Sequence, residues 1–515
     1  MSLLKNFATV GGATAASRVL GFVRDMFIAA ALGTGPVADA FFVAFRFPNL
    51  FRRLFAEGAF NSAFVPLFAK ALEGDGEAEA RRFGEEALSG LLFALLALSA
   101  VIEIAMPLFM FVMAPGFSAD PEKFDLTVLL TRIAFPYLTL VSLVALYSGV
   151  LNARGKFAAA AFAPTLLNVV LVAALVLIFE LGYADTPNAG IVLSAATVIG
   201  GVAQLAMVAW AAARNGMLLR LVRPRWDERM KRLAALALPG VLAGGITQIN
   251  IVIGTMIASL APGAVSYLYY ADRIYQLPLG IVGIAIGIVL LPDLSRRLRA
   301  GRDDLADHTQ NRALEFAMAL TLPAAIALIV MAEPIIALLY QRGSFAAADT
   351  NATAMALVAF AAGLPAFVLV KVFSPGFFAR EDTRTPMWFA GISVAVNIGV
   401  SLALFPLLAH VGIAIATSLA GWVNMVLLAV TLWRRGHFTL DALLVRRVPL
   451  LALASLLMGG CLFVAVRLLA GPLADPHLVM RGAAVGALVL GGVVLFAAFC
   501  QLTGVVDFRK ALRRG

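Results

Sequence analysis

The chain has 515 residues, of which 62% are hydrophobic and only 14% are charged, and its mean hydropathy is +0.93. Soluble domains are about 45–50% apolar and about 25% charged, so this composition excludes an ordinary soluble protein. The net charge of +10 comes mostly from basic residues beside apolar runs. That placement is typical of membrane orientation signals, and it disfavours nucleic-acid binding.

A helix needs about 20 apolar residues to cross a bilayer, and the chain holds many runs of that length. The first run continues through Arg18 and Arg24 to Leu32, which is too long for a cleaved signal peptide. We therefore expect a retained first helix in an all-α polytopic membrane protein with about 14 transmembrane helices. The expected spans are 4–32, 36–69, 84–114, 124–152, 157–180, 188–213, 233–260, 264–295, 312–341, 350–378, 386–407, 410–433, 443–470 and 481–506.

The loops between these spans differ sharply in their content of Lys and Arg. Of the 40 Lys and Arg residues, 28 fall in loops or termini on one side and four fall on the other, among them Lys123. Because basic loops stay in the cytoplasm, the pattern predicts that both termini are cytoplasmic.

An internal repeat divides the chain into similar halves. Five local similarities recur at offsets of 226 to 230 residues, including Pro66 with Pro292 and Asn168 with Asn397. Each copy holds six expected spans, so both copies have the same orientation and are related by an axis along the membrane normal. We expect a six-helix lobe at 1–220, a second at 227–440, and a two-helix C-terminal appendage at 441–515.

Charged residues gather in two adjacent spans near the N-terminus and in one span of the second half. An intramembrane charge costs roughly 2.5–3.5 kcal/mol on insertion scales, so these residues cannot face lipid. Arg18 and Asp25 are seven residues apart, which places them on one helix face. The candidate site residues are Arg18, Arg24, Asp25, Asp39, Arg46, Arg52, Arg53, Glu57, Asp272 and Arg273.

Two interpretations of these charges compete. They can form internal salt bridges, such as Arg24 with Asp39 or Arg53 with Glu57, that lock helices together. However, the six arginines outnumber the four carboxylates. A surplus of positive charge favours a cavity for an anionic ligand, because arginine suits phosphate oxygens. The repeat-related Asn168 and Asn397 are expected to form hydrogen bonds between helices.

Four motifs carry a resemblance to a known family. They read ASRVLGFVRD, ADAFFVAFRFPNLFRRLFAEGAFNSAFVPLF, YYADRIYQLPLG and LLPDLSR. Together they resemble the MurJ/MviN family of lipid II flippases, within the multidrug/oligosaccharidyl-lipid/polysaccharide exporter superfamily. The resemblance implies a bacterial inner-membrane transporter, not an enzyme, that serves peptidoglycan and cell wall biogenesis. It would move lipid II, an undecaprenyl-diphosphate-linked precursor, from the cytoplasmic to the periplasmic leaflet by alternating access.

The resemblance also implies roles for particular residues. Arginines matching Arg18, Arg24, Arg52 and Arg273 face the family's cavity, the aspartate matching Asp39 is functionally important, and the appended helices form a groove for the lipid tail. Some members hold sodium, but Gly254 and Ser401 stand here where acids would be expected. Asn397 and Thr417 alone make a poor cation site, so we expect no cofactor, and membrane potential is an alternative energy source. The implied partners are lipid II, membrane lipids and cell-wall synthesis proteins, with a functional monomer.

Other functions stay open at this point. One alternative is an exporter of another polyprenyl-linked glycan or of drugs, although a drug exporter would favour an acidic cavity. A membrane-embedded glycosyltransferase would need an outer catalytic domain, and the outward loops are short. A scaffold without transport activity would tolerate neutralisation of the arginines in the first two spans.

Overall fold

The computed structural model describes residues 3–52 and 60–505, and within them it contains helices but no strands. Nine described helical segments are long and apolar enough to cross a membrane. The expected all-α polytopic membrane class is therefore confirmed, whereas the count of 14 spans stays a prediction. Two expected spans, 386–407 and 410–433, form the single helix α15, whose backbone breaks at Ala409 with φ of 46°.

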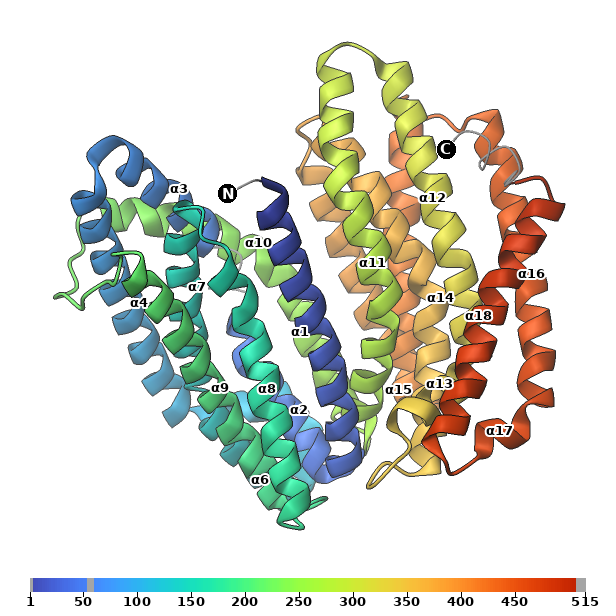
Figure 1. Cartoon of the computed structure of the whole chain (residues 1–515), viewed down its shortest axis with the longest axis horizontal. Coiled ribbons are helices and arrows are strands. Elements are labelled where there is room, and N and C mark those ends of the chain that lie inside the picture. Colours follow the sequence, from blue (N-terminus) through green and yellow to red (C-terminus); the bar gives the residue numbers. More distant parts are fainter. Residues whose placement is uncertain (1–2, 53–59, 506–515) are drawn as a thin grey trace. The chain divides into compact units, whose positions relative to one another are not determined.

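The chain divides into two compact units, and Figure 1 labels their helices. Unit 1 comprises Met1–Ser266 with Arg342–Phe345, and unit 2 comprises Tyr267–Gln341 with Ala346–Gly515. The six-helix lobes and the appendage are defined by the internal repeat rather than by contacts, and they stay a proposal.

The helices of unit 1 begin with two long N-terminal segments and end with α10. They are α1 (Leu3–Leu32), α2 (Pro36–Phe51), α3 (Asn61–Lys70), the π-helix η2 (Ala71–Asp75), α4 (Glu77–Ile104), α5 (Met106–Met113), the 3-10 helix η3 (Pro115–Ala119), α6 (Pro121–Ala134), α7 (Tyr137–Ala153), α8 (Ala158–Glu180), α9 (Pro187–Arg214) and α10 (Glu228–Ala258). Proline stands at the first turn of α2, α6 and α9, where its missing N–H costs nothing.

The helices of unit 2 begin with the long helix α11, whose first three residues belong to unit 1. They are α11 (Ala264–Arg299), α12 (Asp303–Val330), α13 (Ala332–Tyr340), α14 (Ala347–Phe378), α15 (Arg384–Arg434), α16 (Ala442–Leu468), α17 (Ala470–Ala474) and α18 (Leu478–Leu502).

Helix lengths repeat at the offset found in the sequence. Helices α4 and α12 both have 28 residues, and their first residues, Glu77 and Asp303, lie 226 positions apart. Each is followed by a short helix after one residue with non-helical backbone angles, Ala105 in unit 1 and Met331 in unit 2. These matched bounds support a duplication.

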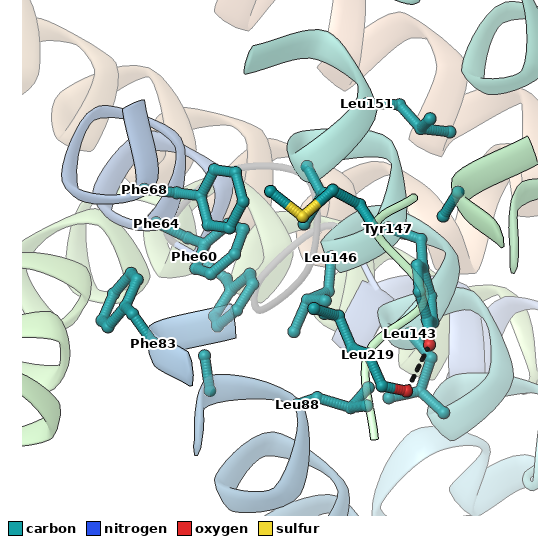
Figure 2. Packing of buried hydrophobic residues seen from close by; sticks show 14 of the residues in the cluster. Phe60, Phe64, Phe68, Phe83, Leu88, Leu143, Leu146, Tyr147, Leu151 and Leu219 are labelled. Atoms are coloured by element: carbon teal, nitrogen blue, oxygen red, sulfur yellow. Dashed lines mark hydrogen bonds between the residues drawn. The ribbon is translucent and has the colours of Figure 1, made fainter. Parts of the chain in front are cut away.

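An apolar cluster in unit 1 joins α3, α4 and α7 (Figure 2). Phe64 and Phe68 of α3 are fully buried in it, and Phe83 of α4 stacks on Phe64 with ring centroids 5.7 Å apart. The hydroxyl of Tyr147 donates to the carbonyl of Leu219 at 3.4 Å, which fastens the segment after α9 to the same cluster. This packing joins α3, α4, α7 and the segment after α9 in one apolar core.

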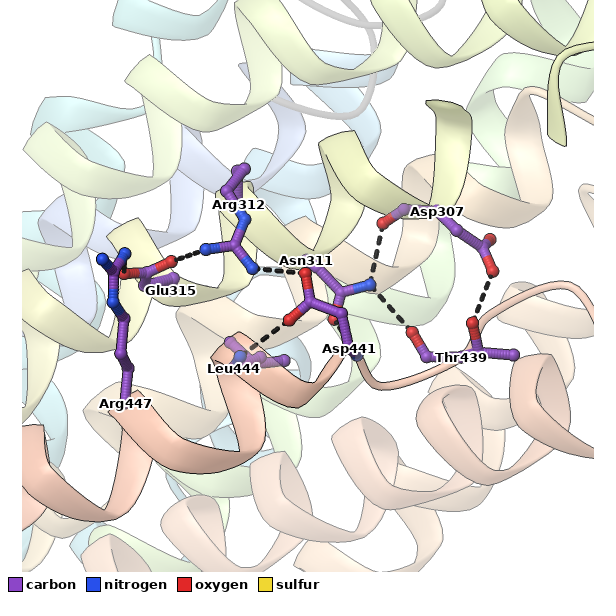
Figure 3. A network of polar contacts seen from close by, with 8 residues as sticks. All are labelled: Asp307, Asn311, Arg312, Glu315, Thr439, Asp441, Leu444 and Arg447. Carbon is purple, nitrogen blue, oxygen red and sulfur yellow. Dashed lines mark hydrogen bonds and ion pairs between the residues drawn. The ribbon is translucent and has the colours of Figure 1, made fainter. Parts of the chain in front are cut away.

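A polar network fastens the start of α16 to α12 within unit 2 (Figure 3). Arg312 pairs with Glu315 and with Asp441, and Arg447 pairs with Glu315 at 2.5 Å. Asn311 donates to the carbonyl of Thr439 at 2.8 Å. The acids and the arginines of this network neutralise one another, so the protein itself satisfies the charges at this junction.

The turn between α1 and α2 needs a glycine. Gly33 has φ of +60°, and a Cβ there would lie 2.4 Å from the carbonyl oxygen of Ser344. Ser344 N donates to Ala30 O at 2.9 Å, so residues 342–345 pack closely on this turn. Gly182 offers a matched comparison, because its φ is +68° and nothing lies within 4 Å of its Cβ position.

We expect Gly33→Ala to lower the free energy of unfolding clearly more than Gly182→Ala. The second change carries only the left-handed backbone cost of about 1–2 kcal/mol, whereas the first adds a backbone clash. Thermal unfolding of the purified variants in detergent measures both effects. Equal shifts would show that the approach of Ser344 to Gly33 contributes nothing.

Candidate functional site

Arg24 lies in a buried polar cluster between α1 and α8. Its Nε and Nη2 donate to Asp25 Oδ1 at 3.0 and 2.7 Å, and its Nη1 donates to Asn168 Oδ1 at 2.9 Å. Arg24 is 6% exposed and Asp25 is 2% exposed. Asn168 Nδ2 then donates to the carbonyl of Ser17 at 2.9 Å. The expected helix–helix role of Asn168 is confirmed, and it orients the guanidinium of Arg24.

Arg18 does not join this cluster, although it shares a helix face with Asp25. Its side chain is exposed, and the structure shows no ion pair for it among the described residues. Asp25 instead pairs with the adjacent Arg24. The seven-residue spacing placed Arg18 and Asp25 on a common face, but it did not indicate that they lie at different depths in the packing.

Asp39 occupies a second buried cluster, at the start of α2. Its carboxylate accepts from Lys123 Nζ at 2.7 Å, and from Gly263 N at 3.0 Å. It also accepts from Ser266, through the backbone N at 3.1 Å and through Oγ at 2.7 Å. Asp39 is 0% exposed. This one carboxylate therefore joins α2 to the start of α6 and to the first residues of α11.

The partner of Asp39 differs from the pairing considered from the sequence. Asp39 pairs with Lys123 and not with Arg24, so that pairing was wrong. Lys123, which the charge count placed in an outer loop, is 9% exposed and lies in the first turn of α6. Its position directly before an expected span was the only sequence signal for this role, and Lys123 was not among the predicted site residues.

Two further arginines of α2 and its C-terminal cap are half-buried. Arg46 Nη1 donates to Thr255 Oγ1 of α10 at 2.6 Å. Arg52 Nε donates to Asn49 Oδ1 at 3.0 Å. Both donate to neutral oxygens in these contacts, so these bonds do not cancel their charge. The candidates Arg53 and Glu57, and hence their proposed pair, lie outside the described residues.

The candidates of unit 2 lie on α11. Arg273 Nη2 donates to the hydroxyl of Tyr269 at 2.9 Å, and its guanidinium lies 4.8 Å from the centre of the same ring. Asp272 accepts from the side-chain amide of Gln276. A neutral phenol thus orients Arg273 through both a hydrogen bond and a cation–π contact.

The residues considered for sodium bind one another. Asn397 Oδ1 accepts from Ser401 Oγ and from Thr417 Oγ1, both at 3.4 Å. In the described part of the chain, no group of three or more His, Cys, Asp or Glu side chains could hold a metal ion. These contacts involve only neutral oxygens, and the expectation that the protein uses no sodium stays a prediction.

Comparison with known proteins decides the family. The family model described as "Lipid II flippase MurJ" matches residues 28–481. The chain belongs to the lipid II flippase MurJ family. A "Probable lipid II flippase MurJ" of Rhizobium meliloti (strain 1021) is 52% identical, over 100% of this chain and 97% of that protein. One of Rickettsia prowazekii (strain Madrid E) is 35% identical over the full length of both chains.

Solved structures agree with the MurJ assignment. The structure titled "Lipid II flippase MurJ, inward closed conformation" has a TM-score of 0.80 and 25% identity, covering 96% of this chain and 98% of that chain. A multidrug resistance MATE family transporter of the MOP superfamily has a TM-score of 0.68. At 15% identity, with 81% of this chain and 94% of that chain covered, it shows the fold alone. The MurJ family is one of transporters rather than enzymes.

Proposed function

We propose that this protein flips lipid II across the bacterial inner membrane, from the cytoplasmic to the periplasmic leaflet. The observation that carries the proposal is the full-length match, at 52% identity, to a protein named as a probable lipid II flippase. Alternating access supplies the movement, and no covalent chemistry is needed. Both termini are cytoplasmic in this proposal, as the distribution of basic residues favours.

The cavity arginines hold the diphosphate in this proposal. Asp39 is already neutralised by Lys123, so it does not balance the candidate arginines. Six arginines then stand against the three carboxylates of Asp25, Glu57 and Asp272. This surplus suits a diphosphate, because guanidinium groups donate in pairs to phosphate oxygens. Arg24, Arg52 and Arg273 are the proposed contacts, and surplus positive charge would let membrane potential act on the cycle.

A drug exporter is the candidate that the fold alone would allow, since a multidrug transporter shares the architecture. The basic character of the candidate residues disfavours it, because cationic drugs need acidic partners.

Depletion of the native protein, with complementation by variants, tests the function. Lipid II in each leaflet is scored by labelling from the periplasmic side. We expect Arg273→Ala to lower the periplasmic signal about tenfold or more, because a hydrogen bond to a charged group contributes about 1.5–3 kcal/mol. Tyr269→Phe removes the hydroxyl but keeps the ring, so it separates orientation of Arg273 from its charge. Unchanged lipid II distribution in Arg273→Ala would contradict the proposed contact.

A further inference from the structure

Unit 1 carries a small pocket where α3 ends and where α4 and α10 begin. The pocket has a volume of about 170 Å³ and is lined by Leu67, Lys70, Ala71, Asp75, Phe83, Arg229 and Arg232. We propose that this pocket binds a phosphate group, which comes either from the headgroup of an anionic membrane lipid or from a soluble phosphate. The site is separate from the arginine clusters of α1 and α2.

The charges of the pocket favour an anion. The pocket is lined by three cations, Lys70, Arg229 and Arg232, and by one carboxylate, Asp75. Arg229 Nη1 pairs with Glu79 Oε1 at 2.7 Å, which holds its guanidinium in place. Lys70 and Arg232 have no ion pair among the described residues. Three exposed cations thus share one lining carboxylate, and a bound phosphate would supply the negative charge that balances the other two.

The floor of the pocket is preformed. Phe83 is 3% exposed and Ala71 is 8% exposed, and both belong to the apolar cluster of Figure 2. Ala71 also begins the π-helix η2, which leads from Lys70 to Asp75. Short π-helical turns are rare and frequently occur at functional sites. A packed apolar floor, together with an arginine held by Glu79, lowers the entropy cost of ordering a bound group.

The start of α16 in unit 2 provides a comparison for the pocket. Helix α10 begins after Asp227, which caps it through Met230 N at 2.9 Å, and helix α16 begins after Asp441, which caps it through Leu444 N at 2.7 Å. Helix α10 packs against α4, and α16 packs against α12, the repeat partner of α4.

The two junctions differ in how their cations are neutralised. In unit 2, Glu315 and Asp441 neutralise Arg312 and Arg447 (Figure 3). In unit 1, Lys70 and Arg232 form no ion pair among the described residues, although Asp75 also lines the pocket. The lining of the unit 1 pocket therefore carries a surplus of positive charge, which an external anion can balance.

The size of the pocket limits the ligand. Pockets for drug-sized molecules measure about 300–1,000 Å³, and a water molecule occupies about 30 Å³. A volume of about 170 Å³ therefore suits one phosphate with a small substituent. Arg229 and Arg232 also line an adjoining, more open hollow of about 520 Å³, so a larger group attached to the phosphate has room on that side.

The test measures binding by the full-length protein in lipid nanodiscs. In one arm, inorganic phosphate is titrated by calorimetry into protein in phosphatidylcholine nanodiscs. In the other, native mass spectrometry counts the phosphatidylglycerol molecules retained after release from mixed nanodiscs. The variant is Lys70→Ala with Arg232→Ala. The matched control is Arg223→Ala with Arg225→Ala, which removes the same charge from exposed positions of the linker before α10.

We expect the pocket variant to bind at least about tenfold more weakly in one arm or both, and the control to stay within about twofold of the parent. Loss in the phosphate arm identifies a soluble phosphate, and loss in the lipid arm identifies a headgroup. Parent-like binding by the pocket variant in both arms would overturn the proposal, as would an equal loss in the control. Neither readout involves transport, so failure here leaves the flippase proposal intact.

Discussion

Arg24→Ala is expected to abolish lipid II flipping, and to destabilise the protein as well. The guanidinium donates to both Asp25 and Asn168 in a buried cluster. Removing it breaks the buried ion pair with Asp25, and breaking such a pair costs about 3–5 kcal/mol in comparable proteins. Thermal unfolding of the purified protein measures this loss, and the leaflet distribution of lipid II in depleted cells measures flipping.

A double variant separates the two effects. Arg24→Ala with Asp25→Asn removes both charges, and we expect it to regain most of the lost stability. If Arg24 contacts the diphosphate, flipping stays absent in this stable protein. Restored flipping would instead show that Arg24 only neutralises Asp25. Arg132→Ala is the matched control, because Arg132 is an exposed arginine of α6 whose Nε donates to the carbonyl of Glu103.

Asp39→Ala is expected to cause the second large effect, a loss of about 3–5 kcal/mol in the free energy of unfolding. The change leaves Lys123 as an unpaired buried cation, and it removes the acceptor for three donors on Gly263 and Ser266. The melting temperature in detergent measures the effect. Glu122→Ala, which removes an exposed carboxylate beside Lys123, is the control and should leave the melting temperature unchanged.

Two further variants identify which interaction of Asp39 stabilises the protein. Asp39→Asn keeps an oxygen acceptor for Ser266 but leaves Lys123 unpaired, so we expect an intermediate loss. Asp39→Asn with Lys123→Met removes both charges and keeps the acceptor, and we expect it to regain most of the stability. A double variant no better than Asp39→Asn alone would show that the ion pair is not the source of the stability.

The sequence predicted features that depend on local chemistry and on composition. Apolar run length predicted the membrane class, because a helix must satisfy its own backbone groups in lipid. The repeat offset of 226 found at Pro66 and Pro292 is the offset between the starts of α4 and α12. The bilayer cost of charge marked Arg24, Asp25 and Asp39 as residues that cannot face lipid, and all three are buried.

Only the tertiary structure decided which partners these charges have. Helical periodicity gives the face on which a residue lies, but it does not give the neighbour that packs there. Asp39 binds Lys123, 84 positions away, and Arg24 binds Asn168, 144 positions away. A buried charge takes whatever counter-charge the packing brings within about 3 Å. The sequence by itself thus determined that α1 and α2 carry charges that cannot face lipid, whereas packing decided that Asp39 is held by Lys123 while Arg18 stays exposed.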